Sequence, residues 1–159
     1  MNADGHPVAM IPFEEMTEGK SFSFETVITF QNIDRFSQAT GDVSPLHMQE
    51  QFARERGFNG RVVHGAFLGG LVSRLVGVHF PGRECLVLSV RLKFPTPTYA
   101  GDVVRVEGIV DQVSEATRAI VLRVKIRNAK TSFLLAQGKV TIGFTQVVSD
   151  DGTMSPINS

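Results

Sequence analysis

Two side chains that can exchange protons, Asp42 and His47, lie five positions apart in the segment Gly41–His47. Pro45 and the residues before it disfavour a helix, so we expect a loop that leaves one helix and enters another. Such a loop brings the carboxylate and the imidazole within hydrogen-bond reach of one water molecule. An acid and a base beside one water are the smallest set of groups needed to add or remove water across a double bond.

A second pair of interest stands further along the chain, where His64 and Gly65 precede an apolar stretch. The pattern predicts that this pair opens a helix, and the first N–H groups of a helix have no partner within it. Donors at the positive end of the helix dipole stabilise a developing oxyanion. We expect the N–H of Gly65 to do so, because a residue without a side chain lets a carbonyl group approach the backbone closely.

Each of these residues also has a purely structural interpretation, which the pattern alone leaves open. An aspartate between Gly and Ser-Pro often only caps a turn, as Asp42 would, and a loop histidine such as His47 is often solvated or bonded to the backbone. For His64 we expect an orienting or packing role at the helix start. For His79 we expect an interaction with the C-terminal end of the helix dipole, and for Cys85 the role of a small apolar residue.

Composition narrows the function classes further. The 159-residue chain has 16 basic and 16 acidic side chains, and this zero net charge argues against a nucleic-acid or acidic-membrane partner. Its single cysteine excludes a disulfide-stapled scaffold and thiolate-rich metal clusters. Among the four histidines only His47 and His64 are plausible neighbours, so we predict no metal site. The sequence also has no phosphate-binding loop, dinucleotide fingerprint or nucleophile elbow.

Alternating apolar and polar side chains predict an antiparallel sheet. Period-two alternation is typical of strands with one buried face, and short, turn-like connections favour a meander of the last four strands. The five expected strands are Phe22–Phe30, Leu86–Phe94, Val103–Val113, Ala119–Arg127 and Phe133–Phe144. In the second of them, the residues expected on the buried face are Leu86, Leu88, Val90, Leu92 and Phe94.

The apolar face of this sheet needs a cover, and the segment Gly65–Phe80 fits that need. It is apolar on nearly all sides and about four turns long, which is typical of a buried helix. Gly69, Gly70 and Gly77 each lower the helix propensity, so we expect them to permit close approach of backbone or ligand. We therefore predict the α+β class and the hot-dog fold, a curved antiparallel sheet of about five strands wrapped around a central apolar helix.

Two shorter helices are expected before the central one. The first is Ile33–Thr40, with Asn32 as its N-cap and Gly41 just beyond its end, and the second is Gln49–Glu55. They belong to the same domain as the sheet and the central helix.

That domain is expected to span residues 13–145, between flexible tails at 1–12 and 146–159 that are rich in Gly, Pro, Asn, Asp and Ser. No signal peptide or membrane-spanning window is visible in the sequence, so we expect a cytoplasmic protein without a membrane partner. A single hot-dog leaves sheet edges unpaired, so we expect a homodimer or a higher assembly of dimers.

The residues that carry the chemistry also carry a family resemblance. The run Phe36–His47, followed by Phe52-Ala53 and Val63-His64-Gly65, resembles the hydratase 2 motif of the MaoC-like dehydratases, which are (R)-specific enoyl-CoA hydratases of hot-dog fold. The segment Phe94–Asp102 is similar to the family's F-x-x-P-V-x-x-G-D segment. The likeness covers roughly residues 13–145. Asp-x-x-Pro-Leu-His followed by His-Gly is far more specific than either part alone.

The resemblance implies a hydro-lyase, an (R)-specific enoyl-CoA hydratase or 3-hydroxyacyl-thioester dehydratase. It implies that Asp42 and His47 hold and activate a water for syn addition across a trans-2-enoyl thioester, and that the Gly65 N–H binds the thioester oxygen. The substrate implied is an acyl thioester of CoA or of a phosphopantetheine carrier, with no separate cofactor.

Ser44, His64, Ser73 and Val76 are further residues expected at the substrate. Ser44 stands where the family usually has Asn, so it keeps a donor and an acceptor but shortens the reach. Ser73 falls where some members place a serine facing the site, although a hydroxyl bonded to the helix backbone explains it equally well. Val76 is expected to shape the acyl tunnel.

Three arginines near the motif leave two interpretations open. Arg54, Arg56 and Arg61 are placed either to meet the phosphates of CoA or a carrier, or to form a solvated face.

Two other functions stay open. Many hot-dog thioesterases place a carboxylate on or beside the central helix, and the absence of Asp and Glu from Gly65–Phe80 argues against them. A catalytically silent acyl-thioester-binding subunit would keep the fold and the pocket. The intact Asp42, His47 and Gly65 argue against that alternative, whereas Ser44 leaves it open.

Overall fold

The computed structural model describes residues 7–145. The helices are η1 (Phe13–Glu15), α1 (Phe30–Thr40), α2 (Pro45–Met48), α3 (Glu50–Glu55), α4 (Gly65–Arg74) and η2 (Leu75–His79). The strands are β1 (Ser21–Val27), β2 (Cys85–Lys93), β3 (Val103–Ser114), β4 (Ala119–Asn128) and β5 (Leu134–Phe144). Of the tails predicted at residues 1–12 and 146–159, residues 1–6 and 146–159 lie outside the described residues.

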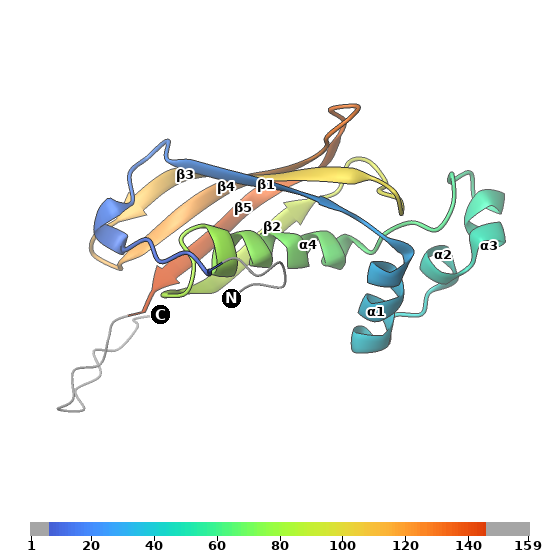
Figure 1. Ribbon diagram of the computed structural model, residues 1–159, viewed down its shortest axis with the longest axis horizontal. Helices are drawn as coiled ribbons and strands as arrows, with labels where there is room; N and C mark the ends of the chain where they lie inside the picture. Colours follow the sequence, from blue (N-terminus) through green and yellow to red (C-terminus); the bar gives the residue numbers. More distant parts are fainter. Residues whose placement is uncertain (1–6, 146–159) are drawn as a thin grey trace.

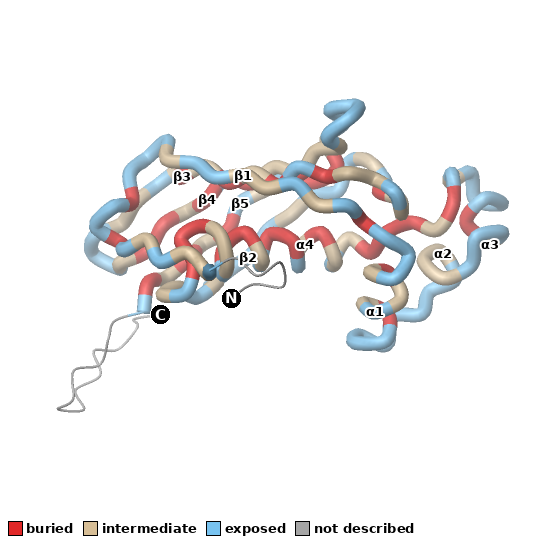
Figure 2. The backbone as a smooth tube through the Cα atoms, viewed as in Figure 1, coloured by how far each residue is buried: buried red, intermediate tan, exposed pale blue. Residues whose placement is uncertain are grey.

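One antiparallel sheet and one helix form the body of the molecule (Figure 1). The strands lie in the order β1-β3-β4-β5-β2, so β1 and β2 form the two edges. Helix α4 runs along one face of the sheet, and the layer between them is buried (Figure 2). Side chains of this layer include Val106, Leu122, Val124, Val140 and Ile142 from the sheet and Leu68, Val72, Leu75 and Val76 from the helix. The predicted sheet around a central apolar helix is confirmed.

The predicted buried faces are correct for β3 and β4, and for β2 they are wrong before a bulge and correct after it. A bulge between Val87 and Ser89 shifts the pairing of β2 with β5. Before the bulge Leu86 pairs with a residue of the outer face, and after it Val90 pairs with the buried Val140. Because opposite partners share a face, the expected apolar row changes sides at the bulge. Leu86 and Val90 are also about half exposed, at 52% and 47%, because β2 is an edge strand.

Helix α1 begins earlier than expected and ends as expected. Its N-cap is Thr29, not Asn32: the Thr29 side chain accepts from the Asn32 N–H, and the Asn32 side chain accepts from the Thr29 N–H. This capping box explains why β1 ends at Val27, because the predicted strand to Phe30 would lose it. Gly41 closes the helix in the left-handed conformation, with φ of 77°, and donates its N–H to the Ser37 carbonyl.

The other helices depart from the prediction in two places. The segment expected as one helix, Gly65–Phe80, is α4 followed by the wider π turn η2. The segment expected as a plain loop contains the single-turn helix α2, because Pro45 occupies its first turn, where a missing N–H is harmless. His47 therefore stands on a helical turn rather than on a free loop.

Part of the predicted N-terminal tail, residues 9–11, makes backbone hydrogen bonds to the rest of the domain. Ala9 and Ile11 donate backbone hydrogen bonds to Val78 and Pro81, and the Ala9 carbonyl accepts from Arg83. These bonds attach the segment to the turn between η2 and β2. Within residues 7–145 no helix is long and apolar enough to cross a membrane.

Thr29→Ala tests how far the capping box supports the helix that leads to the motif. Loss of the cap should lower the free energy of unfolding by about 1 kcal/mol and the Tm by a few degrees. Gln31→Ala, at an exposed position of the same first turn, is the control and should change the stability by less than about 0.5 kcal/mol. Thermal and urea unfolding followed by circular dichroism measure both. Equal effects of the two substitutions would contradict the role of the cap.

Candidate active site

The loop after α1 is shaped by short-range bonds that turn the Asp42 side chain back on its own segment. The Asp42 N–H donates to Thr40 Oγ1 at 3.3 Å, and Asp42 Oδ1 accepts from the Ser44 N–H at 3.2 Å. A carboxylate that accepts from the N–H two residues later is typical of aspartate turns. The Asp42 side chain is half exposed, at 50%, so it remains accessible to water.

His47 is held by a backbone carbonyl from another part of the chain. Its Nδ1 lies 2.6 Å from the carbonyl oxygen of Val62. Because a carbonyl oxygen only accepts, Nδ1 must carry the hydrogen, and the neutral ring then has its lone pair on Nε2. This bond therefore fixes the tautomer that can take a proton from water at Nε2. The imidazole is half-buried, between α2 and the start of α4.

His64 is buried and ties the Asp42 backbone to the start of α4. Its side chain is 2% exposed, and its Nε2 lies 3.1 Å from the Asp42 carbonyl oxygen and 3.3 Å from Ser37 Oγ. Its ring stacks on that of His47, with centroids 3.8 Å apart, and is flanked by Phe36 at 4.9 Å. The orienting and packing role expected for His64 agrees with these contacts.

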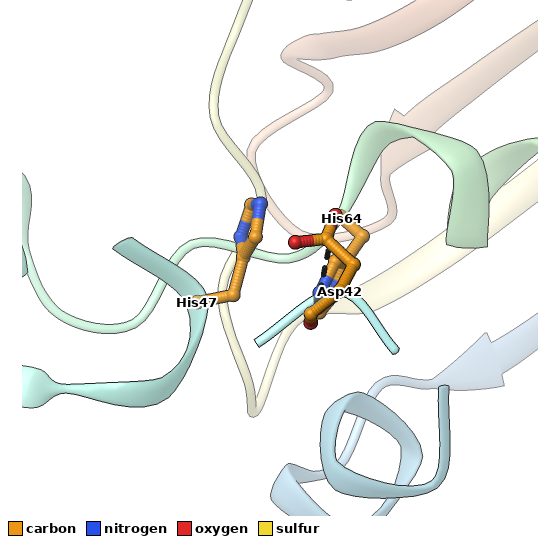
Figure 3. Close-up of side chains that lie close together, drawn as sticks. All are labelled: Asp42, His47 and His64. Atoms are coloured by element: carbon orange, nitrogen blue, oxygen red, sulfur yellow. Dashed lines mark hydrogen bonds and ion pairs between the residues drawn. The ribbon is translucent and has the colours of Figure 1, made fainter. Parts of the chain in front are cut away.

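Figure 3 shows the three side chains Asp42, His47 and His64 gathered at one place. One nitrogen or oxygen from each lies within 4.8 Å of the others. The sequence predicted the pair Asp42 and His47, and it also suggested His47 and His64 as neighbours; the structure places all three side chains together. The donor set suits water better than a resident metal, because the His64 Nε2 that donates to the Asp42 carbonyl has no lone pair left for a ligand bond. That no metal binds here stays a prediction.

A pocket of about 310 Å³ opens beside His47. Gly65, the first residue of α4, lines it, and the ring of Phe94 lies so close that a Cβ at Gly65 would come within 3.1 Å of it. Apolar side chains and the Pro97–Thr98 backbone complete the walls, so the pocket suits an acyl thioester more than a charged ligand. The other lining residues are Phe58, Val62, Val63, Leu68, Thr96, Pro97 and Thr98.

The other residues expected at the substrate lie elsewhere in this single chain. Ser44 is exposed and starts α2, and its backbone rather than its hydroxyl bonds to Asp42. Ser73 lies on the exposed side of α4, and Val76 is buried in the core with 1% exposure. Neither borders the pocket of residues 7–145, and contact of the three with substrate stays a prediction.

Of the three arginines, Arg61 has a structural role, because its side chain bonds to both α1 and α2. Its guanidinium pairs with Asp34 and donates to the His47 carbonyl at 2.6 Å, with the Arg61 side chain only 14% exposed. These bonds leave it unable to meet a distant phosphate. Arg54 pairs with Glu50, and Arg56 lies over the Phe52 ring at 4.5 Å, so both belong to the surface of α3 and the turn after it.

Sequence reasoning missed the groups that position the pair. The sequence does not single out the Val62 carbonyl, because every residue has a backbone carbonyl group. Ser37 carries the signal of a polar residue on the inner side of α1, where it is 2% exposed, between Ile33 and the motif. Its hydroxyl lies 3.0 Å from Met48 Sδ as well as beside His64, so it connects α1 to α2.

Comparison with known proteins agrees with this geometry. The model of the MaoC like domain matches residues 14–132. The chain belongs to the MaoC-like domain family. A 3-hydroxybutyryl-CoA dehydratase of Methylorubrum extorquens is 32% identical over 108 residues, which are 67% of this chain and 69% of that protein. An (R)-specific enoyl-CoA hydratase of Rhodospirillum rubrum is 33% identical over 92 residues, which are 58% of this chain and 64% of that protein.

Solved structures of two R-hydratases share the fold. The (R)-hydratase of A. caviae superimposes with a TM-score of 0.78 at 25% identity, covering 82% of this chain and 98% of that one. The R-hydratase of Pseudomonas aeruginosa in its unliganded form gives a TM-score of 0.82 at 23% identity, covering 97% and 99% of the two chains. These matches confirm the hot-dog fold for this MaoC-like chain.

The tautomer of His47 can be tested directly by long-range ¹H–¹⁵N NMR of the imidazoles. In the neutral ring Nδ1 should show the signal of a protonated nitrogen and Nε2 that of an unprotonated one, because the Val62 carbonyl accepts from Nδ1. The spectrum of His47→Gln identifies which signals belong to this ring. A neutral ring protonated at Nε2 would contradict the proposed orientation.

Proposed function

We propose that this chain is an (R)-specific hydratase of trans-2-enoyl thioesters, which also catalyses the reverse dehydration of 3-hydroxyacyl thioesters. The observation that carries the proposal is the placement of Asp42 beside His47, which lines one pocket together with Gly65 at the start of α4. The hydratases and dehydratases named among its relatives are hydro-lyases, which supports the same reaction type. The proposed reaction needs the thioester and water and no further cofactor.

The geometry suggests how the hydroxyl group of the water would be added to the β-carbon and its proton to the α-carbon. The Asp42 carboxylate accepts one O–H of the water, and the lone pair on His47 Nε2 accepts the other. As the water oxygen bonds to the β-carbon, His47 takes its proton and then delivers it to the α-carbon. Both new bonds form on the side of the double bond that faces the pair, which makes the addition syn. The electron pair of the double bond is held meanwhile as an enolate.

The Gly65 N–H would stabilise the negative charge that develops on the thioester oxygen. Gly65 is the first residue of α4, so its N–H is among those that lack a partner within the helix. A side chain here would meet the ring of Phe94 and fill the place of the carbonyl group. Loss of one such donor typically slows a reaction by about 10²–10³-fold.

Hydration of crotonyl-CoA, followed as loss of the absorbance of the conjugated thioester, tests the function and the site together. Asp42→Asn and His47→Gln should each lower kcat/KM by about 10²–10⁴-fold, because each removes a proton-handling group. His79→Gln is the matched control, since this imidazole stacks on Phe22 and Phe24 and lies outside the pocket. It should keep the wild-type activity, and the product should be the (R)-3-hydroxyacyl thioester.

Two outcomes separate failure of the function from failure of the site. If the wild type hydrates no enoyl thioester of any chain length, on CoA or on a carrier, the hydratase proposal is wrong and a silent binding subunit is favoured. If the wild type is active and Asp42→Asn and His47→Gln both remain fully active, only the assignment of the residues is wrong. Thioester cleavage without hydration would favour a thioesterase instead.

We also propose that the chain works as a homodimer or as a larger assembly of dimers. The edge strand β2 exposes Leu86, Leu88 and Val90, and an unpaired apolar edge is a surface that proteins normally cover. On α4 and η2 the exposed side is a row of small residues, which permits close packing of a second helix. These residues are Ala66, Gly70, Ser73 and Gly77. The cytoplasmic location stays a prediction.

Sedimentation at micromolar concentration tests the assembly. We expect a mass of at least twice 17.4 kDa. Val90→Lys should weaken the association, because a charge on a free edge opposes strand pairing. A wild-type mass of a single chain would show that the dimer proposal is wrong.

A further inference from the structure

The sheet turns one face toward α4 and the other away from it (Figure 1). On the face turned away, the strands β2, β5 and β4 carry a concentration of basic side chains. Arg91, Lys139 and Arg123 lie directly opposite one another in one row across the three strands. In the next row Lys93 and Lys125 lie on either side of a glutamine. We call these five residues the basic face. A chain of zero net charge thus gathers positive charge on one surface.

The row of like charges is only partly compensated within the chain. Side chains directly opposite on neighbouring strands interact, and like charges in these positions destabilise the sheet. Asp111 of β3 forms ion pairs with Lys139 Nζ at 2.8 Å and with Arg123 Nε at 3.4 Å. The hydrogen bond from Lys139 holds the pKa of the Asp111 carboxyl below its usual value. One carboxylate therefore serves two of the three cations.

The other three cations of the basic face, Arg91, Lys93 and Lys125, have less compensation from acidic side chains. Glu107 of β3 lies opposite Lys125 in the strand register. Within residues 7–145 no acidic side chain lies within ion-pair distance of Arg91, Lys93 or Lys125. Arg91 and Lys93 are exposed on the edge strand, where an incoming partner meets them first. An acidic partner would complete the compensation that the chain leaves open.

The shape of the basic face favours a protein partner. The face surrounds a hollow of about 630 Å³, and no aromatic ring lines it on which a nucleotide base would stack. The β4 and β5 backbones pair with strands on both sides, so the ladder uses their N–H groups and none form a phosphate cradle. Cations spread over three strands on long side chains match carboxylates spread over a protein surface. A second copy of this chain would instead oppose like charges.

The basic face ends one residue before the wall of the pocket beside His47. Lys93 is the last residue of β2, and Phe94, the next residue, lines the pocket that contains His47. A partner docked on the outer face could therefore lead a flexible arm around the end of β2 to the water held by the pair. We propose that the basic face docks the carboxylate-rich surface of a carrier protein, which delivers the acyl group as a phosphopantetheine thioester. The choice of carrier rests on the proposed function.

Binding to a type II acyl carrier protein loaded with a crotonyl group tests the docking by calorimetry, independently of catalysis. Arg91→Gln combined with Arg123→Gln keeps the Lys139–Asp111 pair and should raise the Kd by about tenfold or more. Arg35→Gln combined with Arg83→Gln removes the same charge from exposed positions elsewhere and should leave the Kd unchanged. Salt should weaken wild-type binding more than binding by the first variant. Unfolding curves should show no loss of stability in that variant, because like charges have been removed.

The kinetic arm distinguishes the carrier from CoA. For the Arg91→Gln, Arg123→Gln variant, kcat/KM with the crotonyl carrier protein should fall by about tenfold, and kcat/KM with crotonyl-CoA should stay at the wild-type value. An equal loss on both substrates, absence of carrier binding by the wild type, or an unchanged Kd would overturn the docking proposal. So would tighter, face-dependent binding of CoA alone or of duplex DNA. Face-dependent carrier binding by a chain that hydrates neither thioester would leave the docking standing and reject the hydratase function.

Discussion

The apolar face of the sheet is shielded from water by packing against α4, and this packing limits where reactive side chains can lie. Leu68 and Val72 of α4 and Leu75 of η2 are buried, so the side of the helix that faces the sheet holds apolar rather than reactive polar groups. Only its first turn, with unpaired N–H groups, reaches the end of the sheet. Asp42 and His47, the proposed acid–base pair, accordingly come from the segment between α1 and α4, which lies beyond that end (Figure 1).

A short stretch of backbone before α4 assembles the site from parts that are distant in sequence. The Val62 carbonyl orients His47, and His64 bonds to the Asp42 carbonyl while its ring supports that of His47. Gly65 follows at once with its N–H. The residues 62–65 thus set the positions of His47, of the loop that carries Asp42 and of the Gly65 N–H together. Any shift of this stretch would move all three groups in concert.

The sequence predicted what depends on side-chain type and missed what depends on backbone. Alternation identified the buried faces of β3 and β4, and the Asp42–His47 spacing identified the pair, because apolarity and charge are visible in the residue letters. The Val62 carbonyl left no trace. The bulge in β2 was equally invisible, because every even-numbered residue from 86 to 94 is apolar, whichever face it takes. The capping box was misread because Thr29 and Asn32 are both good N-caps.

The extra residue at that bulge determines which side chains lie on each face of the edge strand β2. After it, even-numbered positions turn inward, so Phe94 reaches the wall beside Gly65 while Arg91 and Lys93 turn outward. Without it the parity would reverse, and the ring and the two cations would exchange sides. The inward and outward alternation of residues in β2 therefore links the shape of the pocket beside His47 to the charge of the opposite surface. Insertions or deletions of one residue in this strand would alter the two together, whereas those of two residues would preserve both.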